Sequence, residues 1–597
     1  MKRQLQNNSS VSTNLNDKSR FKHLGSLTFK MLVCFLLFSL TNSFIRVQGI
    51  NEVLVPGKKI EKQLHIDERH SYSLKMVKNS CIDLEIKETS VNVAIDVLGP
   101  DRKKINTFYT YFTNGFEFVS FIAPSNGTFY FEVYPQIETE GIDEAGIVNQ
   151  KKRNQGLYEL SSSVLYSAKE GIRRIEARTK TLEWIRGNAL VLKSVKADTR
   201  FDDLNPLKEI LKNVQIVGLG EATHGTKEFF QMKHRMIEFL VKEMGYKVIA
   251  IEASYAGCNQ VNDYIQSGKG DFQSILGSLG LHVNTQEFSD MITWMRDYNS
   301  SVTNDKKIKI VGIDFPVNYL GGTFNKIKNY LEKVDLFSAN KTDSLFKIAE
   351  KIDMGWRAGI NLDSCKNKFI EFVGQFAINR GLYTQRSSWD EYNNIFLDLK
   401  VIGQSLSVAC LNTFKTRNES VKLRDFYMAS NLMDLMLGEE PSAKFIVWAH
   451  NGHISKLEPL TDQNSKMFGN YLKEVFGDRY YAFGFSFSKG SFQAYEFSPE
   501  MRKQVLSEIT VTDAKENTLD WYLKQTGIER FIIPFTGNIL PDYVNEFINQ
   551  RFEARSLGAI AGRNYANYVT TTIYVKRCYD ALIFIDNTSR AIPNGSK

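Results

Sequence analysis

Residues 217–252 read VGLGEATHGTKEFFQMKHRMIEFLVKEMGYKVIAIE. The stretch starts as a short apolar run ending in glycine, which is typical of a buried strand. Glu221 and His224 follow where that strand should end, and an amphipathic helix comes next. A second apolar run then ends at Glu252. In an open parallel sheet, ligands bind outside the carboxyl ends of the strands. The pattern therefore predicts an α/β fold with an active site at that edge of the sheet.

Two more apolar runs end in the same way. Residues 308–313 lead to Asp314, and residues 445–447 lead into the segment WAHNGH, which holds His450 and His453. The chain has 8 histidines. Four of them, counting His234, lie in this segment or in the opening stretch, so we expect an active site built from several strand ends.

The spacing of Glu221 and His224 indicates their chemistry. Three residues apart on a tight turn or a first helical turn, they can share one face, where the glutamate orients the imidazole. Glutamate and histidine also suit zinc. The sequence contains no HExxH motif, however, and His450 and His453 lack the i, i+4 spacing of a helical metal clamp. The pattern favours metal-free acid–base chemistry and leaves a metal site as the alternative.

Cations near this cluster are candidates for substrate binding. Lys233 and Arg235 lie on the helix after Glu221, where they could balance carboxylate charge. Lys233 can act only as a point charge, whereas Arg235 could form a bidentate fork. Arg296 is expected to end a helix and contact the cleft. The sequence has neither a glycine-rich phosphate loop nor a GxSxG elbow, so it supports neither a nucleotide site nor a serine triad of the α/β-hydrolase type.

Length and charge limit the class of protein. A chain of 597 residues predicts two or more domains. The formal charge is +8, but the first 49 residues hold seven Lys/Arg and one Asp, so most of the excess lies there. No basic tract with interleaved aromatic residues occurs, which argues against nucleic-acid binding.

The N-terminal segment resembles an export signal. Its basic start precedes an apolar run at 31–40, which is shorter than the roughly 20 residues of a membrane span but suits a signal peptide. Residues 1–49 are therefore predicted to be a signal peptide, or else an uncleaved anchor, of a secreted or periplasmic bacterial protein. Five cysteines follow Cys34, with no CxxC pair, so neither a disulfide framework nor a zinc knuckle is expected.

The next part of the chain predicts an all-β domain. Short apolar or alternating runs, separated by turn signals, occur at 70–76, 81–86, 91–98, 116–122, 128–134 and 157–164. Such spacing is typical of a β-sandwich. The segments AIDVLGP (94–100) and GTFYFEV (127–133) resemble jelly-roll modules of the pre-peptidase C-terminal type. The expected layout is a sandwich at 50–165, a helical linker at 166–185 and a catalytic domain at 186–597, with a helical insertion at about 319–440. The catalytic domain is predicted to have a mixed, mostly parallel sheet with flanking helices.

Several motifs, in order, resemble the erythromycin esterase family. They are GEATHG (220–225), FF with KHR (229–235), IEA (251–253), WMR (294–296), GID (312–314), RD (424–425), AHNGH (449–453), RSLGA (555–559) and YDALIFID (579–586).

This resemblance implies a mixed α/β fold and hydrolysis of an ester, in known members the macrolactone of a macrolide antibiotic. It implies attack by water without a covalent intermediate, with His224 as general base, supported by Glu221 and Glu252. His450 would hold the substrate carbonyl or stabilise the oxyanion. The residues expected to bind substrate or support the site are Lys233, Arg235, Arg296, Asp314 and His453.

No metal or cofactor is expected, and the expected partner is a small-molecule ester. Membrane contact is expected only through an uncleaved N-terminal segment, and the oligomeric state is left open. Two alternatives stand beside this prediction. One is a metal-dependent hydrolase or protease of the same superfamily. The other is a non-enzymatic protein that binds a glycan, or haem through His450 and His453.

Overall fold

A computed structural model describes most of the chain from residue 51 to residue 594. Within that range the description leaves out residues 66–67, 109–115, 137–154, 198–199, 278, 280–282, 316–319, 354–358, 412–416, 458–465, 499–502, 537–538, 563–565 and 567–569. The predicted signal peptide or anchor at 1–49 lies outside the described residues.

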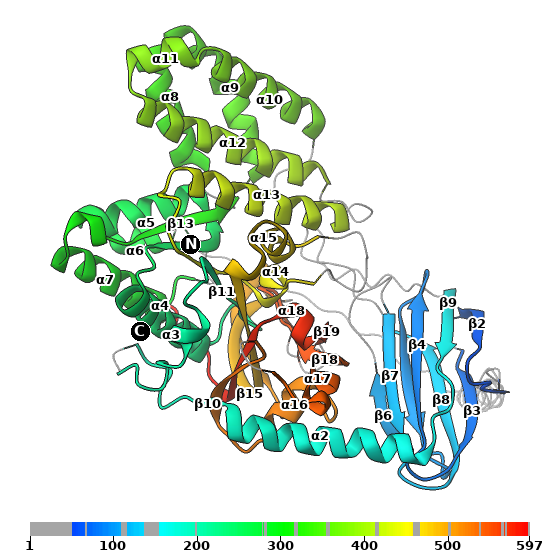
Figure 1. Ribbon diagram of the computed structural model, residues 1–597. Coiled ribbons are helices and arrows are strands. Elements are labelled where there is room, and N and C mark those ends of the chain that lie inside the picture. Colours follow the sequence, from blue (N-terminus) through cyan, green and yellow to red (C-terminus); the bar gives the residue numbers. More distant parts are fainter. Residues whose placement is uncertain are drawn as a thin grey trace, which may run out of the picture.

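The first described domain is a sandwich of two sheets (Figure 1). One sheet has the strand order β1 (Asn51–Val53), β3 (His70–Met76), β8 (Gly127–Pro135), β5 (Val93–Leu98), β6 (Lys104–Phe108). The other has the order β2 (Lys59–His65), β9 (Gln155–Ser162), β4 (Cys81–Glu88), β7 (Phe116–Ile122). Alternate side chains point inward and form one apolar core, which includes Tyr72, Ile82, Ile95, Phe129 and Phe131. The six sequence-predicted runs correspond to β3, β4, β5, β7, β8 and β9, whereas β1, β2 and β6 were not predicted.

Helix α2 (Ala168–Asn188) connects the sandwich to the second domain and runs beneath that domain (Figure 1). Ser167 caps the helix, because its side chain accepts a hydrogen bond from the backbone N–H of Glu170. Arg174 on this helix binds Asp83 of the sandwich, and Ile185 is buried in the core of the second domain. The helix therefore joins the two domains through side-chain contacts as well as through the backbone.

The second domain is built on a mixed sheet. Its parallel strands lie in the order β13 (Lys309–Asp314), β12 (Val248–Ser254), β14 (Phe445–Trp448), β11 (Ile216–Leu219), β15 (Tyr480–Ser498), β20 (Ala581–Thr588). Three strands add antiparallel: β17 (Arg530–Pro534) on β20, β10 (Leu190–Val191) on β17, and β16 (Lys503–Val511) on β15. A separate pair consists of β18 (Arg551–Arg555) and β19 (Thr570–Tyr574).

Helices cover both faces of this sheet, because the parallel strands are apolar on both sides. One face packs against α4 (Lys227–Met244), α5 (Tyr255–Ser267), α6 (Phe272–Gly277) and α7 (Gln286–Ser301). The other packs against α13 (Arg417–Leu437), α14 (Asn451–Ile454), α15 (Phe468–Phe476), α16 (Leu519–Lys524), α17 (Asp542–Ile548) and α18 (Val575–Cys578).

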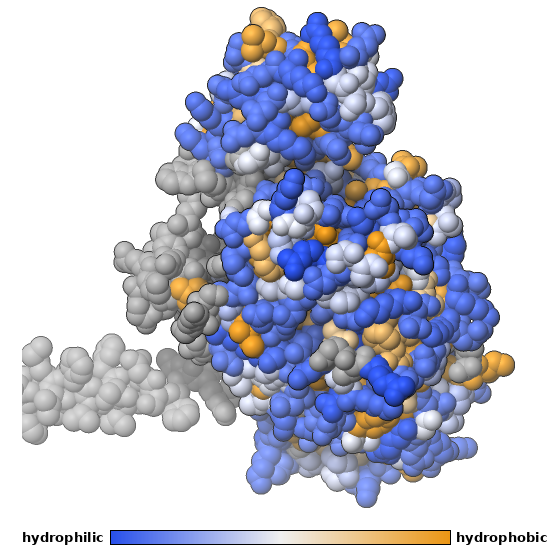
Figure 2. Space-filling view, turned by 90° about the vertical axis from the view of Figure 1, so that its left-hand side faces the viewer, coloured by the Kyte–Doolittle hydropathy of each residue, from blue (hydrophilic) through white to orange (hydrophobic). Residues whose placement is uncertain are grey.

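Between β13 and α13 the chain forms a group of helices at the top of Figure 1. These are α8 (Leu320–Val334), α9 (Leu336–Asp353), α10 (Leu362–Ile378), α11 (Arg380–Arg386) and α12 (Trp389–Leu411), and they share a core of their own. By length and composition α12 could cross a membrane, but Ile395, Leu399 and Ile402 on this helix are buried in that core. Figure 2 shows a mostly hydrophilic surface on one side of the molecule, with apolar side chains in small groups.

Candidate active site

Four neighbouring strands deliver the polar residues that the sequence singled out. In the sheet order β13, β12, β14, β11, the strands end within two residues of Asp314, Glu252, His450 and Glu221 respectively. Because these strands are parallel and adjacent, their carboxyl ends lie side by side. The pairing of β12 with β13 shifts between Ile251 and Ser254, a bulge at Glu252. Such irregularities re-aim a side chain at the end of a strand.

Glu221 is the centre of the first half of the site. Its Oε1 lies 2.6 Å from His224 Nδ1, and its Oε2 lies 2.6 Å from Lys233 Nζ. Trp448, the last residue of β14, also donates Nε1–H to Oε2 at 3.0 Å. The preceding residue must be glycine, because a Cβ at Gly220 would lie 2.1 Å from Asn451 Oδ1. The strand end therefore packs tightly on the WAHNGH segment and fixes the carboxylate.

The charges of this pair are set by burial and by each other. Burial alone would raise the pKa of Glu221, but Lys233 and His224 outweigh it and lower the pKa to about 2. Burial lowers the pKa of Lys233 to about 8, although Glu221 opposes that change. The ammonium also lies 4.4 Å from the centre of the Trp448 ring, where the aromatic face adds to its stabilisation. At neutral pH, Glu221 is thus an anion that a buried lysine balances.

His224 and His450 lie next to each other, with ring centroids 5.0 Å apart. Glu221 accepts a hydrogen bond from His224 Nδ1–H, which leaves the basic lone pair of that ring on Nε2. In His450 the tautomer is set by the backbone, because Gly452 N–H donates to Nδ1 at 3.2 Å. The proton of His450 therefore resides on Nε2.

The environment keeps His450 neutral. Burial, with a smaller contribution from His224, lowers the pKa of His450 to about 3. Its Nε2 is buried and has no hydrogen-bond partner among the described residues. A buried N–H without an acceptor is unfavourable. The site thus holds a neutral donor whose acceptor would come from a bound molecule, beside a histidine that can accept a proton.

Glu252 is the centre of the second half of the site. Its Oε2 accepts the backbone N–H of His450 at 2.8 Å, and its Oε1 lies 2.8 Å from Arg424 Nη2 and 3.2 Å from His453 Nε2. Arg424, on α13, also binds both carboxylate oxygens of Asp314. Bidentate pairing of this kind fixes orientation as well as charge. Glu252 thereby positions the His450 backbone at the end of β14.

His453 lies between two carboxylates. Its Nδ1 lies 2.8 Å from Asp425 Oδ1. Burial would lower the pKa of His453, but Asp425 and Glu252 outweigh it and raise the pKa to about 10. Arg424 Nη1 also lies 3.2 Å from His453 Nε2. We assign Nε2–H to Glu252 rather than an acceptor role toward Arg424, because two carboxylates favour the cationic ring. Asp314 and Arg424 bind each other within the same network. Burial would lower the pKa of Arg424, but Asp314 and Glu252 outweigh it and raise the pKa.

Arg235 does not join this cluster, unlike Lys233. It is fully buried, and its guanidinium forms a fork with Asp203, with Nη2 to Oδ1 at 2.6 Å and Nη1 to Oδ2 at 3.1 Å. It also donates to the backbone carbonyls of Ser194 and Arg200. Residues two apart on a helix face different directions. Arg235 therefore anchors the segment before β11. Its guanidinium is buried against that segment and does not face the catalytic cluster.

Arg296 also lies apart from the cluster. Its Nη1 donates to the Tyr264 hydroxyl at 2.6 Å, and its Nε and Nη2 contact Asp297. These contacts link α7 to α5 on the outer side of the sheet. The structure therefore brings together Glu221, His224, Lys233, Glu252, Asp314, His450 and His453, and leaves out both predicted arginines.

Three site residues were not among the sequence-predicted ones: Arg424, Asp425 and Trp448. Arg424 and Asp425 lie within helix α13 and do not follow a strand in the sequence, so the strand-end rule could not find them. The only signal was the RD motif that they form in the family resemblance. Trp448 is the first residue of the WAHNGH segment, and nothing in the sequence indicated that its indole N–H donates to Glu221.

The donor set bears on metal binding. Among the described residues, no group of three or more His, Cys, Asp and Glu side chains could hold a metal ion. The described cysteines, Cys81, Cys258, Cys365, Cys410 and Cys578, are not paired in disulfides. A cavity of about 570 Å³ lies elsewhere, between the two domains. The residues that line that cavity include none of the polar residues gathered at the strand ends, so the cavity is separate from the candidate active site.

Comparison with known proteins identifies the family. Residues 241–588 match the family described as erythromycin esterase. A relative named erythromycin esterase type II, from Escherichia coli, is 26% identical over an alignment of 328 residues that covers 52% of this chain and 77% of the relative.

Solved structures share the fold. A Bacillus cereus protein is similar with a TM-score of 0.61 and 22% identity, over 70% of this chain and 99% of that one. A mutant of the erythromycin esterase EreC, in its open conformation, is similar with a TM-score of 0.53 and 16% identity, over 66% of this chain and 97% of that one. The family match covers more than half of the sequence, and the chain belongs to the erythromycin esterase family of hydrolases.

Proposed function

We propose that the protein hydrolyses a carboxylic ester by attack of a water molecule that His224 activates. The observation that carries this proposal is the pair of histidines with opposite tautomers. Nε2 of His224 bears the lone pair, whereas Nε2 of the adjacent His450 bears the proton. A base beside a neutral donor is what attack on a carbonyl requires.

In the first step, His224 Nε2 takes a proton from water as the hydroxyl oxygen bonds to the acyl carbon. The carbonyl oxygen becomes an oxyanion and accepts a hydrogen bond from His450 Nε2–H. The imidazolium that forms on His224 is stabilised by the Glu221 carboxylate 2.6 Å from Nδ1. The tetrahedral species then collapses, the C–O bond to the alcohol breaks, and His224 returns the proton to the leaving oxygen. The products are a carboxylic acid and an alcohol.

The other residues support these two histidines. Lys233 keeps Glu221 ionised in a buried position. Glu252 holds the backbone N–H of His450, and Arg424 fixes Glu252 relative to Asp314. His453 and Asp425 complete that network from the WAHNGH segment and α13. Each residue in these roles acts on the position or charge of His224 or His450.

The substrate class follows from the relatives. A relative of this chain bears the name erythromycin esterase, so macrolide lactones are the first esters to test. The test is a panel of macrolides and simple carboxylic esters incubated with the full chain, with and without a chelator. Hydrolysis that persists with chelator, with no acyl adduct in the intact-protein mass, is expected. Chelator-sensitive hydrolysis would favour the metal-dependent alternative, and an acyl adduct would contradict direct attack by water.

We also propose that the protein is exported, on the basis of the basic start and short apolar run within residues 1–49. Expression in a Gram-negative bacterium followed by fractionation tests this. Accumulation of the protein outside the cytoplasm, with residues 1–49 removed, is expected for a signal peptide. A full-length chain in the membrane fraction would indicate an anchor, and a full-length cytoplasmic chain would contradict export.

A further inference from the structure

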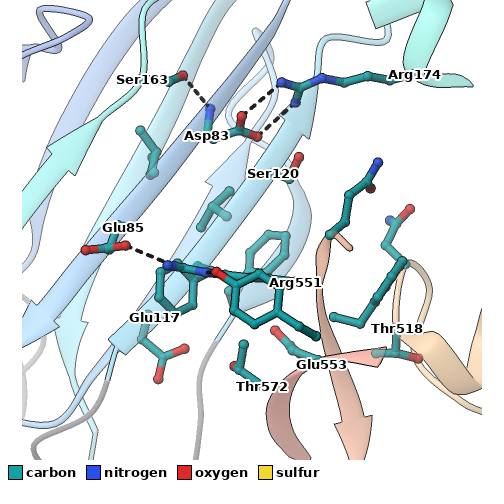
Figure 3. A pocket seen from close by; sticks show the side chains of 18 of the residues that line it. Asp83, Glu85, Glu117, Ser120, Ser163, Arg174, Thr518, Arg551, Glu553 and Thr572 are labelled. Atoms are coloured by element: carbon teal, nitrogen blue, oxygen red, sulfur yellow. Dashed lines mark hydrogen bonds and ion pairs between the residues drawn. The ribbon is translucent and has the colours of Figure 1, made fainter. Parts of the chain in front are cut away.

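A cavity lies between the sandwich and the hydrolase domain (Figure 3). Its volume is about 570 Å³, within the range of about 300–1,000 Å³ that is usual for small-molecule sites. One wall comes from β4 and β7 of the sandwich and a second from α2. The third comes from the segments at 515–522, 546–553 and 572–574 of the hydrolase domain. None of the residues that line it belongs to the catalytic cluster.

Ion pairs hold these walls in fixed positions. Arg174 on α2 binds Asp83 of β4 through both Nη atoms, at 3.0 and 3.1 Å. Arg551 of β18 donates Nη1–H to Glu85 at 2.9 Å, and Figure 3 shows both pairs at the cavity wall. The guanidinium of Arg551 also lies 3.5 Å from the centre of the Phe118 ring. The cavity is therefore formed before any ligand binds, which lowers the entropic cost of binding.

The lining is polar on all three walls. It contains the hydroxyl groups of Ser120, Ser161, Thr518 and Thr572 and the amides of Asn517 and Gln550. Thr518 and Asn517 already bond within the protein, but a purely apolar ligand would offer no partner for the remaining donor and acceptor capacity of this lining, which is unfavourable. Arg174 and Arg551 already bind carboxylates, as does Arg173, which donates Nη2–H to Glu546 at 2.7 Å. A strongly anionic ligand would therefore have to displace existing ion pairs.

Two charged groups in the lining keep unused hydrogen-bonding capacity. The Nε of Arg178 is buried and has no partner among the described residues. Glu553 has one described ion pair, with Lys515 Nζ at 3.4 Å, and burial raises its pKa. A hydroxyl group both donates and accepts, so ligand hydroxyls can satisfy a carboxylate and a guanidinium at once. The rings of Phe108 and Tyr522 line the same cavity and offer flat apolar surface.

We propose that this cavity is a binding site for a neutral, hydroxyl-rich ligand of the saccharide class. The donors and acceptors of the lining match the hydroxyls of a sugar, and the aromatic rings match its apolar C–H face. Such a site would hold the enzyme on a glycan through its sandwich domain, independently of the ester hydrolysis proposed above.

The experiment is calorimetric titration of the full chain with maltotriose, tri-N-acetylchitotriose and, as an anionic probe, trigalacturonate. Ser120→Trp fills the cavity from the sandwich wall. Ser125→Trp is the matched control, because Ser125 lies in the exposed turn after the same strand and does not line the cavity. We expect a neutral trisaccharide to bind, with affinity at least tenfold weaker in Ser120→Trp and unchanged in Ser125→Trp.

Ester hydrolysis should be unchanged in both variants, so a misfolded Ser120→Trp would be recognised by its loss of activity. In that case Glu553→Gln, which removes a charge without filling space, replaces it, and weaker binding is again expected. Binding of neither neutral trisaccharide would overturn the proposal, as would equal binding by the wild type and an active Ser120→Trp. Tighter binding of trigalacturonate than of the neutral probes would also overturn it.

Discussion

Lys233→Met removes the buried cation that balances Glu221. The ammonium is fully buried and lies 2.6 Å from Glu221 Oε2, and methionine has a similar length and no charge. Breaking a buried ion pair by removing one partner costs about 3–5 kcal/mol, because the remaining charge stays buried. This loss is a large part of the roughly 5–15 kcal/mol by which a typical native protein is more stable than its unfolded chain. The variant should therefore fold, with a clearly lower free energy of unfolding.

The same change should lower activity. Without Lys233, the largest effect that opposes burial is lost and only His224 and the Trp448 N–H remain, so the pKa of Glu221 rises and the carboxylate supports the His224 imidazolium less well. We expect kcat to fall by about 100-fold, the lower end of what general-base catalysis contributes. Urea unfolding followed by tryptophan fluorescence measures the stability, and hydrolysis of the best ester from the panel measures kcat.

Lys242→Met is the control for this experiment. Lys242 is on the same helix and pairs with the buried Glu238 one turn away, but its own ammonium is partly exposed, so its removal should cost clearly less than that of Lys233, about 1 kcal/mol. The double variant Glu221→Gln/Lys233→Met removes both charges and should recover part of the lost stability but none of the activity. The reasoning is refuted if Lys233→Met is no less stable than Lys242→Met.

Changes at His450, His453 and Arg235 test three other parts of the structure. His450→Ala removes the buried Nε2–H donor, so kcat should fall by about 100- to 1,000-fold with little change in KM; wild-type kcat would exclude an oxyanion role. Because the folded-state pKa of His453 is about 10, above its ordinary value of 6.5, its contribution to stability is complete below pH 6.5 and is lost as the pH rises toward 10. His453→Gln should therefore flatten the fall in unfolding free energy over that window, and an unchanged urea titration series would contradict the assignment. Arg235→Met should lower stability by about 3–5 kcal/mol, because Asp203 loses its partner, yet leave kcat/KM of the folded enzyme within about twofold; a large rise in KM would restore Arg235 to the site.

The strand ends were predictable because parallel strands that are buried on both faces appear as uninterrupted apolar runs. Residues 248–251 and 445–447 are such runs, and a titratable residue, Glu252 or His450, lies within three residues of the end of each one. The sequence does not give the order of the strands. That β11, β14, β12 and β13 are neighbours depends on how the helices pack, and this adjacency brings Glu221, His450, Glu252 and Asp314 together.

Strands with weaker burial were missed. In β2 only Leu64 is fully buried, and its alternating charges resemble a loop. Lys233 and Arg235 are two residues apart on a helix, and two residues advance a helix by about 200°. The sequence therefore already indicated that only one of them could face the active site. Arg424 gave no local signal, because its partners Glu252 and Asp314 are more than a hundred residues away in sequence. The cavity between the domains likewise combines segments far apart in the sequence.

The most direct test of the account is the activity of His224→Ala. Because His224 is the proposed base, kcat for ester hydrolysis should fall by about 100- to 10,000-fold, with urea unfolding close to that of the wild type. His234→Ala is the matched control on α4, since His234 contacts Glu238 and Trp294 rather than the catalytic cluster, and it should keep its activity. Near-full activity in folded His224→Ala would contradict the central claim that this histidine activates the attacking water.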